Sequence, residues 1–146
     1  MNVLLNGAMG KMGNEVINAI KNVDDIEIVC GFDRIENLDG DFPIYSDINK
    51  ITENVDVIID FSIPIATFKI LEYAQNNNIP IVIATTGFSK EELEKIDDLS
   101  KSIPIFKSSN MSLDINMMSN LVQKIASVLE DSDNEIIETH HNRKVD

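Results

Sequence analysis

The chain has little of several residue types, and each shortage excludes a class of protein. A single cysteine, Cys30, cannot form an internal disulfide. It lies in an apolar run, so we expect a small core residue in a reducing compartment, the cytoplasm. No apolar run approaches the roughly 18 residues that a membrane-spanning helix needs. No basic region followed by an apolar stretch stands at the N-terminus, so we expect no secretory signal.

Basic residues are also scarce. The 12 Lys and Arg residues face 25 Asp and Glu residues, which gives a formal net charge of −13. Nucleic acids and anionic membranes are bound by clustered Lys and Arg, so we expect neither as a partner. An anionic ligand would gain no long-range attraction here and would have to be held by local dipoles and a few placed cations.

Short apolar runs rich in Val and Ile alternate with stretches whose apolar residues recur at helical spacing. We expect strands at Val3–Leu5, Ile26–Phe32, Val55–Phe61, Ile81–Ala84, Ile103–Phe106 and Glu135–Ile137. We expect helices at Lys11–Val23, Ile65–Asn76, Lys90–Ser100 and Leu113–Leu129, and a surface loop at Asp33–Tyr45. Ser89 followed three residues later by Glu92 predicts a capping box at the start of the third helix.

Strands separated by helices predict an α/β fold. Such an order implies right-handed crossovers and a parallel sheet of the Rossmann type, with helices on both faces. The continuous apolar runs Val57–Ile59 and Ile81–Ile83 fit strands that are buried on both sides.

Gly7, Gly10 and Gly13 follow the first predicted strand and open the first predicted helix, the context that a dinucleotide-binding turn requires. The spacing is G-x-x-G-x-x-G, so Ala8 falls on the first position of the usual G-x-G-x-x-G pattern. A small residue makes the tight turn, Gly10 lets the backbone approach a pyrophosphate, and Gly13 allows close packing of helix and strand. The N–H groups at the helix start would hold the phosphates. Alternatively, the glycines only mark a tight turn.

The second predicted strand leads to Asp33, about 20 residues after Gly13, where an acid can bind the adenosine ribose hydroxyls. Arg34 follows directly and could stack on adenine or pair with a 2′-phosphate. An acid beside an arginine predicts tolerance of both NADH and NADPH. A solvated Asp–Arg pair at a strand end is the alternative interpretation.

Three further segments follow strands at the edge where ligands bind in open α/β sheets. They are Asp60–Ser62, Ala84–Phe88 and Ser108–Met111, and they offer small residues, hydroxyls and exposed backbone groups that suit the carboxamide ring of nicotinamide. Each alone has an ordinary turn composition. The three at one edge predict a pocket.

The two histidines of the chain, His140 and His141, are adjacent, and Lys144 follows closely. Histidine can deliver or accept a proton near neutral pH, and lysine can supply a second proton or bind a carboxylate. Two alternatives remain open. The pair could form a metal site with Glu138, although adjacent histidines lack the usual i, i+4 spacing, or all could be surface polar residues.

Taken together, these residues closely resemble the 4-hydroxy-tetrahydrodipicolinate reductase (dihydrodipicolinate reductase) family of bacterial lysine and diaminopimelate biosynthesis. The matching segments are Gly7–Gly13, Asp33–Arg34, Asp60–Ser62, Thr85–Phe88, Ser109–Ser112 and Glu135–Asp146. The last segment is highly specific, because His-His-x-x-Lys-x-Asp after such a run is typical of this family. The resemblance implies a cytoplasmic reductase that uses NADH or NADPH on a cyclic dicarboxylate and forms a homotetramer at full length.

The resemblance also implies roles for single residues. The cofactor phosphates would be bound by Gly7, Ala8, Met9, Gly10, Lys11 and Met12, and the adenosine end by Asp33 and Arg34. The nicotinamide would be flanked by Ala84, Thr85, Thr86, Ser108, Ser109, Asn110 and Met111. His140 would donate or accept a proton, Lys144 would donate a second one, and His141 would contact the substrate. No metal is implied.

The sequence departs from the family pattern in two ways. Ala84 stands where the family usually has glycine. The Pro-Ser-Gly-Thr loop that grips a substrate carboxylate is absent. We therefore expect an N-terminal fragment: a dinucleotide-binding domain at residues 1–111, and at 112–146 the first helix and strand of a truncated α+β substrate and oligomerisation domain, with little activity of its own.

Two other functions compete with this interpretation. One is a non-catalytic NAD(P)-binding module that senses redox state, and the other is a different Rossmann dehydrogenase, such as homoserine dehydrogenase. Both share the glycine turn. Neither accounts for the paired His140 and His141 with Lys144.

Overall fold

The computed structural model describes residues 1–108, 111–129, 131, 133, 135–137 and 139. The chain divides into two compact units, Met1–Ser109 and Asn110–Asp146, and each is described by itself. None of the helices in the described ranges is long and apolar enough to cross a bilayer.

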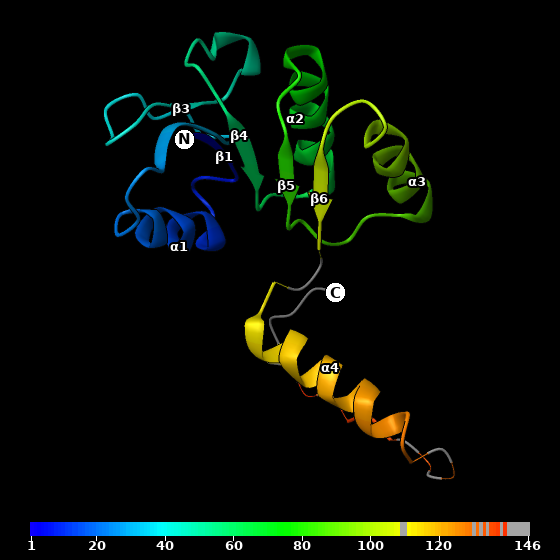
Figure 1. The fold of residues 1–146 in the computed structure, drawn as a ribbon. Helices are drawn as coiled ribbons and strands as arrows, with labels where there is room; N and C mark the ends of the chain where they lie inside the picture. Colours follow the sequence, from blue (N-terminus) through cyan, green and yellow to red (C-terminus); the bar gives the residue numbers. More distant parts are fainter. Residues whose placement is uncertain (109–110, 130, 132, 134, 138, 140–146) are drawn as a thin grey trace. The chain divides into compact units, whose positions relative to one another are not determined.

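The first unit is a parallel sheet with crossover helices (Figure 1). Its strands are β1 (Asn2–Asn6), β2 (Glu27–Phe32), β3 (Ile44–Tyr45), β4 (Val57–Asp60), β5 (Ile81–Ile83) and β6 (Ile105–Lys107). Its helices are α1 (Lys11–Ile20), α2 (Pro64–Asn77) and α3 (Lys90–Leu99), with a 3-10 turn η1 (Ile48–Lys50). The strand order β3-β2-β1-β4-β5-β6 reverses between β1 and β4, which creates a topological switch point. The predicted α/β Rossmann-type fold is confirmed.

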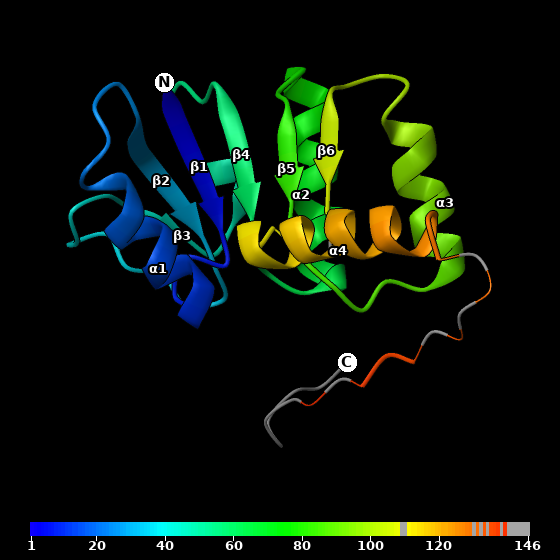
Figure 2. The same ribbon diagram turned by 60° about the horizontal axis from the view of Figure 1, so that its bottom comes forward.

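Helices cover both faces of this sheet, as Figure 2 shows for α1 and α2. The alternation of side chains along β1 explains the arrangement. Leu4 packs into the core beneath α2 and α3, whereas Val3 and Leu5 pack on the opposite face against α1. Each face of β1 therefore contributes to a separate apolar core.

The ends of the helices follow from local sequence. At the start of α3 the Ser89 Oγ accepts a hydrogen bond from the Glu92 N–H at 3.2 Å, and the Ser89 N–H donates to Glu92 Oε2 at 2.8 Å. The predicted capping box is confirmed. Helix α2 begins with Pro64, whose missing N–H costs nothing at that position, and its C-cap residue, Asn78, has a left-handed φ of 54°.

The expected loop at Asp33–Tyr45 is partly wrong, because its last two residues form β3. Ile44 and Tyr45 pair in parallel with Gly31 and Phe32 of β2. A two-residue strand is too short to show a periodic pattern, and its existence depends on the chain folding back onto β2. The last strand of the sheet is also displaced from its expected place at 103–106, since β6 begins at Ile105.

In the second unit, the predicted helix is present and the predicted strand is not. Helix α4 spans Leu113–Ala126, and none of its residues is buried. Residues 135–137 form neither helix nor strand, and Ile136 and Ile137 are 87% and 85% exposed. A strand needs a neighbour for its N–H and C=O groups, and no other strand occurs among the described residues of this unit. The assignment of 112–146 to a substrate domain stays a prediction.

Candidate functional site

The glycine turn joins β1 to α1 at the switch point of the sheet. Gly7 has a φ of +81°, which a glycine adopts without strain, and its N–H donates to the Phe32 carbonyl at 2.9 Å. Its own carbonyl accepts the N–H of Gly10 at 3.0 Å. A Cβ on Gly7 would lie 2.5 Å from the carbonyl oxygen of Phe61. The turn therefore lies directly against the loop that follows β4.

Gly13 brings the first turn of α1 against this bend. A Cβ on Gly13 would overlap the carbonyl oxygen of Gly7 and lie 2.8 Å from that of Ala8. Ala8 itself is 1% exposed and packs in the core beneath α1. The residue with the positive φ is thus Gly7, one position before the start of the G-x-G-x-x-G pattern. The small side chain of Ala8, at the first position of that pattern, packs in the core.

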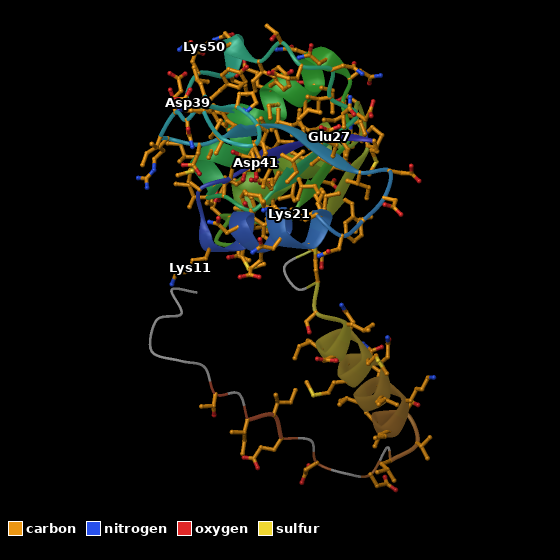
Figure 3. The ribbon with its side chains drawn as sticks, turned by 90° about the vertical axis from the view of Figure 1, so that its left-hand side faces the viewer. Lys11, Lys21, Glu27, Asp39, Asp41 and Lys50 are labelled. Atoms are coloured by element: carbon orange, nitrogen blue, oxygen red, sulfur yellow. The ribbon has the colours of Figure 1, made fainter. Side chains whose placement is uncertain are left out.

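The start of α1 is suited to an anion. Its N-cap residue is Gly10, so no side chain caps the helix, and no acidic residue occupies its first turn. Side chains cap α3 and α4, whereas α2, like α1, has no side-chain cap. The first-turn N–H groups of Lys11 and Met12 have no carbonyl partner within a helix, and the helix dipole favours negative charge there. Lys11 extends from this turn (Figure 3). The residues present therefore fit a pyrophosphate.

Asp33 connects the glycine turn to the end of β2. Its Oδ2 accepts the N–H of Met9 at 2.9 Å, and its Oδ1 accepts the N–H of Arg34 at 2.7 Å. Each carboxylate oxygen keeps a second lone pair, which a ribose hydroxyl could use. Arg34 is exposed beside it. The contact with Met9 was not predicted, because nothing in the sequence pairs these residues.

On the other side of the turn lies the loop after β5. Thr85 is 3% exposed, and its Oγ1 accepts the N–H of Ser62, from the loop after β4, at 2.9 Å. Phe88 packs edge-on against Phe68 of α2, with 6.3 Å between the ring centroids. Thr86, between these fixed points, is exposed. The loop is therefore anchored at both ends.

The structure brings the described site residues together along one edge of the sheet. Asp33 contacts the glycine turn, the turn contacts the loop after β4, and that loop contacts Thr85. The N–H of Ser108 donates to the Ile83 carbonyl at 3.1 Å, so this residue follows the same edge. Ser109, Asn110, His140, His141 and Lys144 lie outside the described residues, and Met111 belongs to the second unit.

Cys30 and the exposed pair of Lys21 and Asp41 are not among the candidate site residues. Burial, and to a smaller extent the charge of Glu53, raises the pKa of the Cys30 thiol to about 12. The thiol is therefore neutral, as expected for a core residue.

Lys21 and Asp41 form an exposed pair at 3.9 Å on the side of the molecule seen in Figure 3. No group of His, Cys, Asp and Glu that could hold a metal occurs among the described residues.

Comparison with known sequences gives a consistent result. A family described as "Dihydrodipicolinate reductase, N-terminus" matches residues 1–111. Curated proteins named 4-hydroxy-tetrahydrodipicolinate reductase from Clostridium novyi and Caldanaerobacter subterraneus are 44% and 46% identical to this chain. Each alignment covers 99% of this chain, but only 58% and 57% of the relative. The chain thus spans a little over half the length of these relatives.

Comparison with solved structures supports the fold. A dipicolinate-bound dihydrodipicolinate reductase from Paenisporosarcina sp. TG-14 matches with a TM-score of 0.76 at 23% identity, over 87% of this chain and 54% of that one. A myo-inositol 2-dehydrogenase from Lactobacillus plantarum matches with a TM-score of 0.64 at 14% identity, over 88% of this chain and 42% of that one. At these identities the likeness concerns the fold alone.

Proposed function

The chain belongs to the dihydrodipicolinate reductase family, and from this membership we propose that it forms the cofactor-binding part of an NAD(P)H-dependent 4-hydroxy-tetrahydrodipicolinate reductase. The reaction reduces 4-hydroxy-tetrahydrodipicolinate to tetrahydrodipicolinate, in the cytoplasm, for lysine and diaminopimelate biosynthesis. The structural observation that supports cofactor binding is the uncapped start of α1 at the switch point, with Asp33 on one side and Thr85 on the other.

The chain's own residues divide the work of holding NADH or NADPH, which supplies a hydride when bound. The turn at Gly7–Met12 would receive the pyrophosphate on backbone N–H groups. Asp33 and Arg34 would contact the adenosine end. The loops after β5 and β6, with Ala84, Thr85, Thr86, Ser108, Ser109, Asn110 and Met111, would flank the nicotinamide ring.

Proton transfer is assigned to residues near the C-terminus of this chain. We propose His140 as the group that donates a proton to the substrate, Lys144 as a second donor, and His141 as a substrate contact. These roles rest on the family resemblance alone, because the three residues lie outside the described part of the chain. We also propose that the protein, at the length of its relatives, is a homotetramer.

The isolated 146-residue chain is expected to bind NADH or NADPH and to turn over little or no substrate. The glycine turn and the Asp33 and Thr85 contacts support cofactor binding, whereas the Pro-Ser-Gly-Thr loop expected to grip a substrate carboxylate does not occur in the sequence. Fluorescence titration measures cofactor affinity, and NADH oxidation in the presence of substrate measures turnover. Absence of binding would refute the proposed function, and robust turnover would refute the proposal that turnover needs this loop.

Arg34→Ala is expected to weaken NADPH binding about tenfold, the loss of one charge-assisted contact to the 2′-phosphate, and to weaken NADH binding less. The two cofactors are titrated against both proteins. Lys101→Ala removes the same charge beyond α3, where the side chain pairs with Asp98 at 2.6 Å, and serves as the control. Equal NADPH affinity in Arg34→Ala and the unmodified chain would contradict the role of Arg34.

A further inference from the structure

A buried carboxylate lies beneath the edge of the candidate site, and none of the roles proposed above for single residues uses it. Asp60 is the last residue of β4 and is 0% exposed. It forms no ion pair with any residue in the described part of the chain. A buried charge without a counter-ion is costly unless hydrogen bonds satisfy it. The partners of Asp60 therefore explain how the residue is tolerated.

Both carboxylate oxygens of Asp60 accept hydrogen bonds. Oδ1 accepts from Asn6 Nδ2 at 2.8 Å, from Ser62 Oγ at 2.5 Å and from the Ser62 N–H at 3.2 Å. Oδ2 accepts from Thr67 Oγ1 at 2.6 Å and from Thr85 Oγ1 at 3.0 Å. Every one of these partners acts as a donor. The hydrogen-bonding capacity of the carboxyl group is therefore met by five donors.

The donors come from four separate elements. Asn6 ends β1 and immediately precedes the glycine turn, and it faces Asp60 across the β1–β4 ladder. Ser62 follows β4, Thr67 lies on α2, and Thr85 follows β5. One side chain thus connects the ends of the strands on both sides of the switch point.

We propose that Asp60 is a positioning residue for the cofactor: its carboxylate holds the loops after β4 and β5 in the geometry that receives the nicotinamide end. The inference rests on the proposed function. Thr85 is fixed twice, since it donates to Asp60 and accepts the N–H of Ser62. A site whose loops are ordered before binding loses less entropy when the ligand arrives. A fully satisfied buried network supplies such order.

Thr67 allows a test that does not touch the cofactor itself. Its side chain is 0% exposed on α2, and its hydroxyl reaches Asp60. Thr67→Val keeps the shape of the side chain and removes the donor. The dissociation constant for NADH is expected to rise about tenfold, equivalent to about 1.4 kcal/mol, the upper range for one net hydrogen bond. Thr67→Ser, which restores a hydroxyl, is expected to restore the affinity.

The ligand ADP-ribose separates the two ends of the site, because it lacks the nicotinamide. Its affinity depends on the glycine turn and Asp33, so Thr67→Val is expected to leave it nearly unchanged. A general loss of stability would weaken the binding of NADH and of ADP-ribose alike. Ile96→Val, a truncation in the core beneath α3, lowers stability without touching the network and is expected to leave NADH affinity unchanged.

Ser62→Ala provides a second variant, on a half-buried loop residue, in case Thr67→Val does not fold. It removes another donor to Asp60, and the same selective loss of NADH affinity is expected. Unchanged NADH affinity in the folded variants, with normal binding by the unmodified chain, would overturn the role of Asp60 alone. A parallel loss of ADP-ribose affinity would overturn it too. Failure of the unmodified chain to bind NADH would overturn the proposed function and this inference together.

Discussion

Gly13→Ala is expected to destabilise the first unit by about 1–3 kcal/mol, the usual cost of overpacking, and to weaken NADH binding roughly tenfold to a hundredfold. The added Cβ would overlap the carbonyl oxygen of Gly7 and approach that of Ala8, both of which belong to the backbone of the turn. The turn must shift to accommodate it. The N–H groups at the start of α1 would then no longer converge on the pyrophosphate.

Thermal unfolding measures the first effect and NADH titration the second. Gly40→Ala is the matched control, because its Cβ would meet the Phe42 carbonyl oxygen at an ordinary distance of 3.4 Å. We expect it to alter neither quantity appreciably. A Gly13→Ala protein that binds NADH as tightly as the unmodified chain would show that the close approach of α1 to the turn is not needed for binding.

His140→Gln is expected to lower kcat by roughly 10²–10⁴, the usual contribution of a positioned acid or base. The amide keeps a similar size and can still form hydrogen bonds, but it cannot deliver a proton near neutral pH. The measurement requires a chain that extends to the length of the curated relatives, since this one spans 58% of the Clostridium novyi protein.

The adjacent residue supplies the control. His141→Gln makes the same change one position along the chain and is expected to raise the KM for the substrate more than it lowers kcat, as befits a binding contact. An unchanged kcat in His140→Gln would remove His140 from the mechanism. Equal losses of kcat in both variants would contradict the separate roles proposed for the two histidines.

The sheet could be predicted from the sequence because its central strands carry apolar residues on both faces. In β1, Val3, Leu4 and Leu5 are all 0% exposed although their side chains alternate between the two cores, and such positions produce the continuous apolar runs that mark parallel strands. Strand β3 could not be predicted, since two residues carry no periodicity. The strand expected at 135–137 was wrong for a related reason: an apolar run becomes a strand only where a neighbour accepts its backbone hydrogen bonds.

The glycine turn of the candidate site could be predicted because backbone conformation constrains residue type there. Gly7 and Gly13 are required by a positive φ and a close contact, and those requirements appear directly as a glycine pattern. The hydrogen bonds that organise the site left no such pattern. Asp60 and its partner Thr85 are 25 positions apart, and a threonine in a turn is unremarkable in sequence. Only the fold brings these side chains together.

The most direct test of the central claim is an NMR titration of the 146-residue chain with NADH, in which each amide N–H reports its own environment. We predict saturable shifts concentrated at Met9–Met12, at Asp33 and at the loops with Ser62 and Thr85. The amides of α4 are the internal reference. Saturable binding whose shifts spare the turn at Gly7–Met12 and fall elsewhere in the chain would contradict the proposal that this turn holds the cofactor.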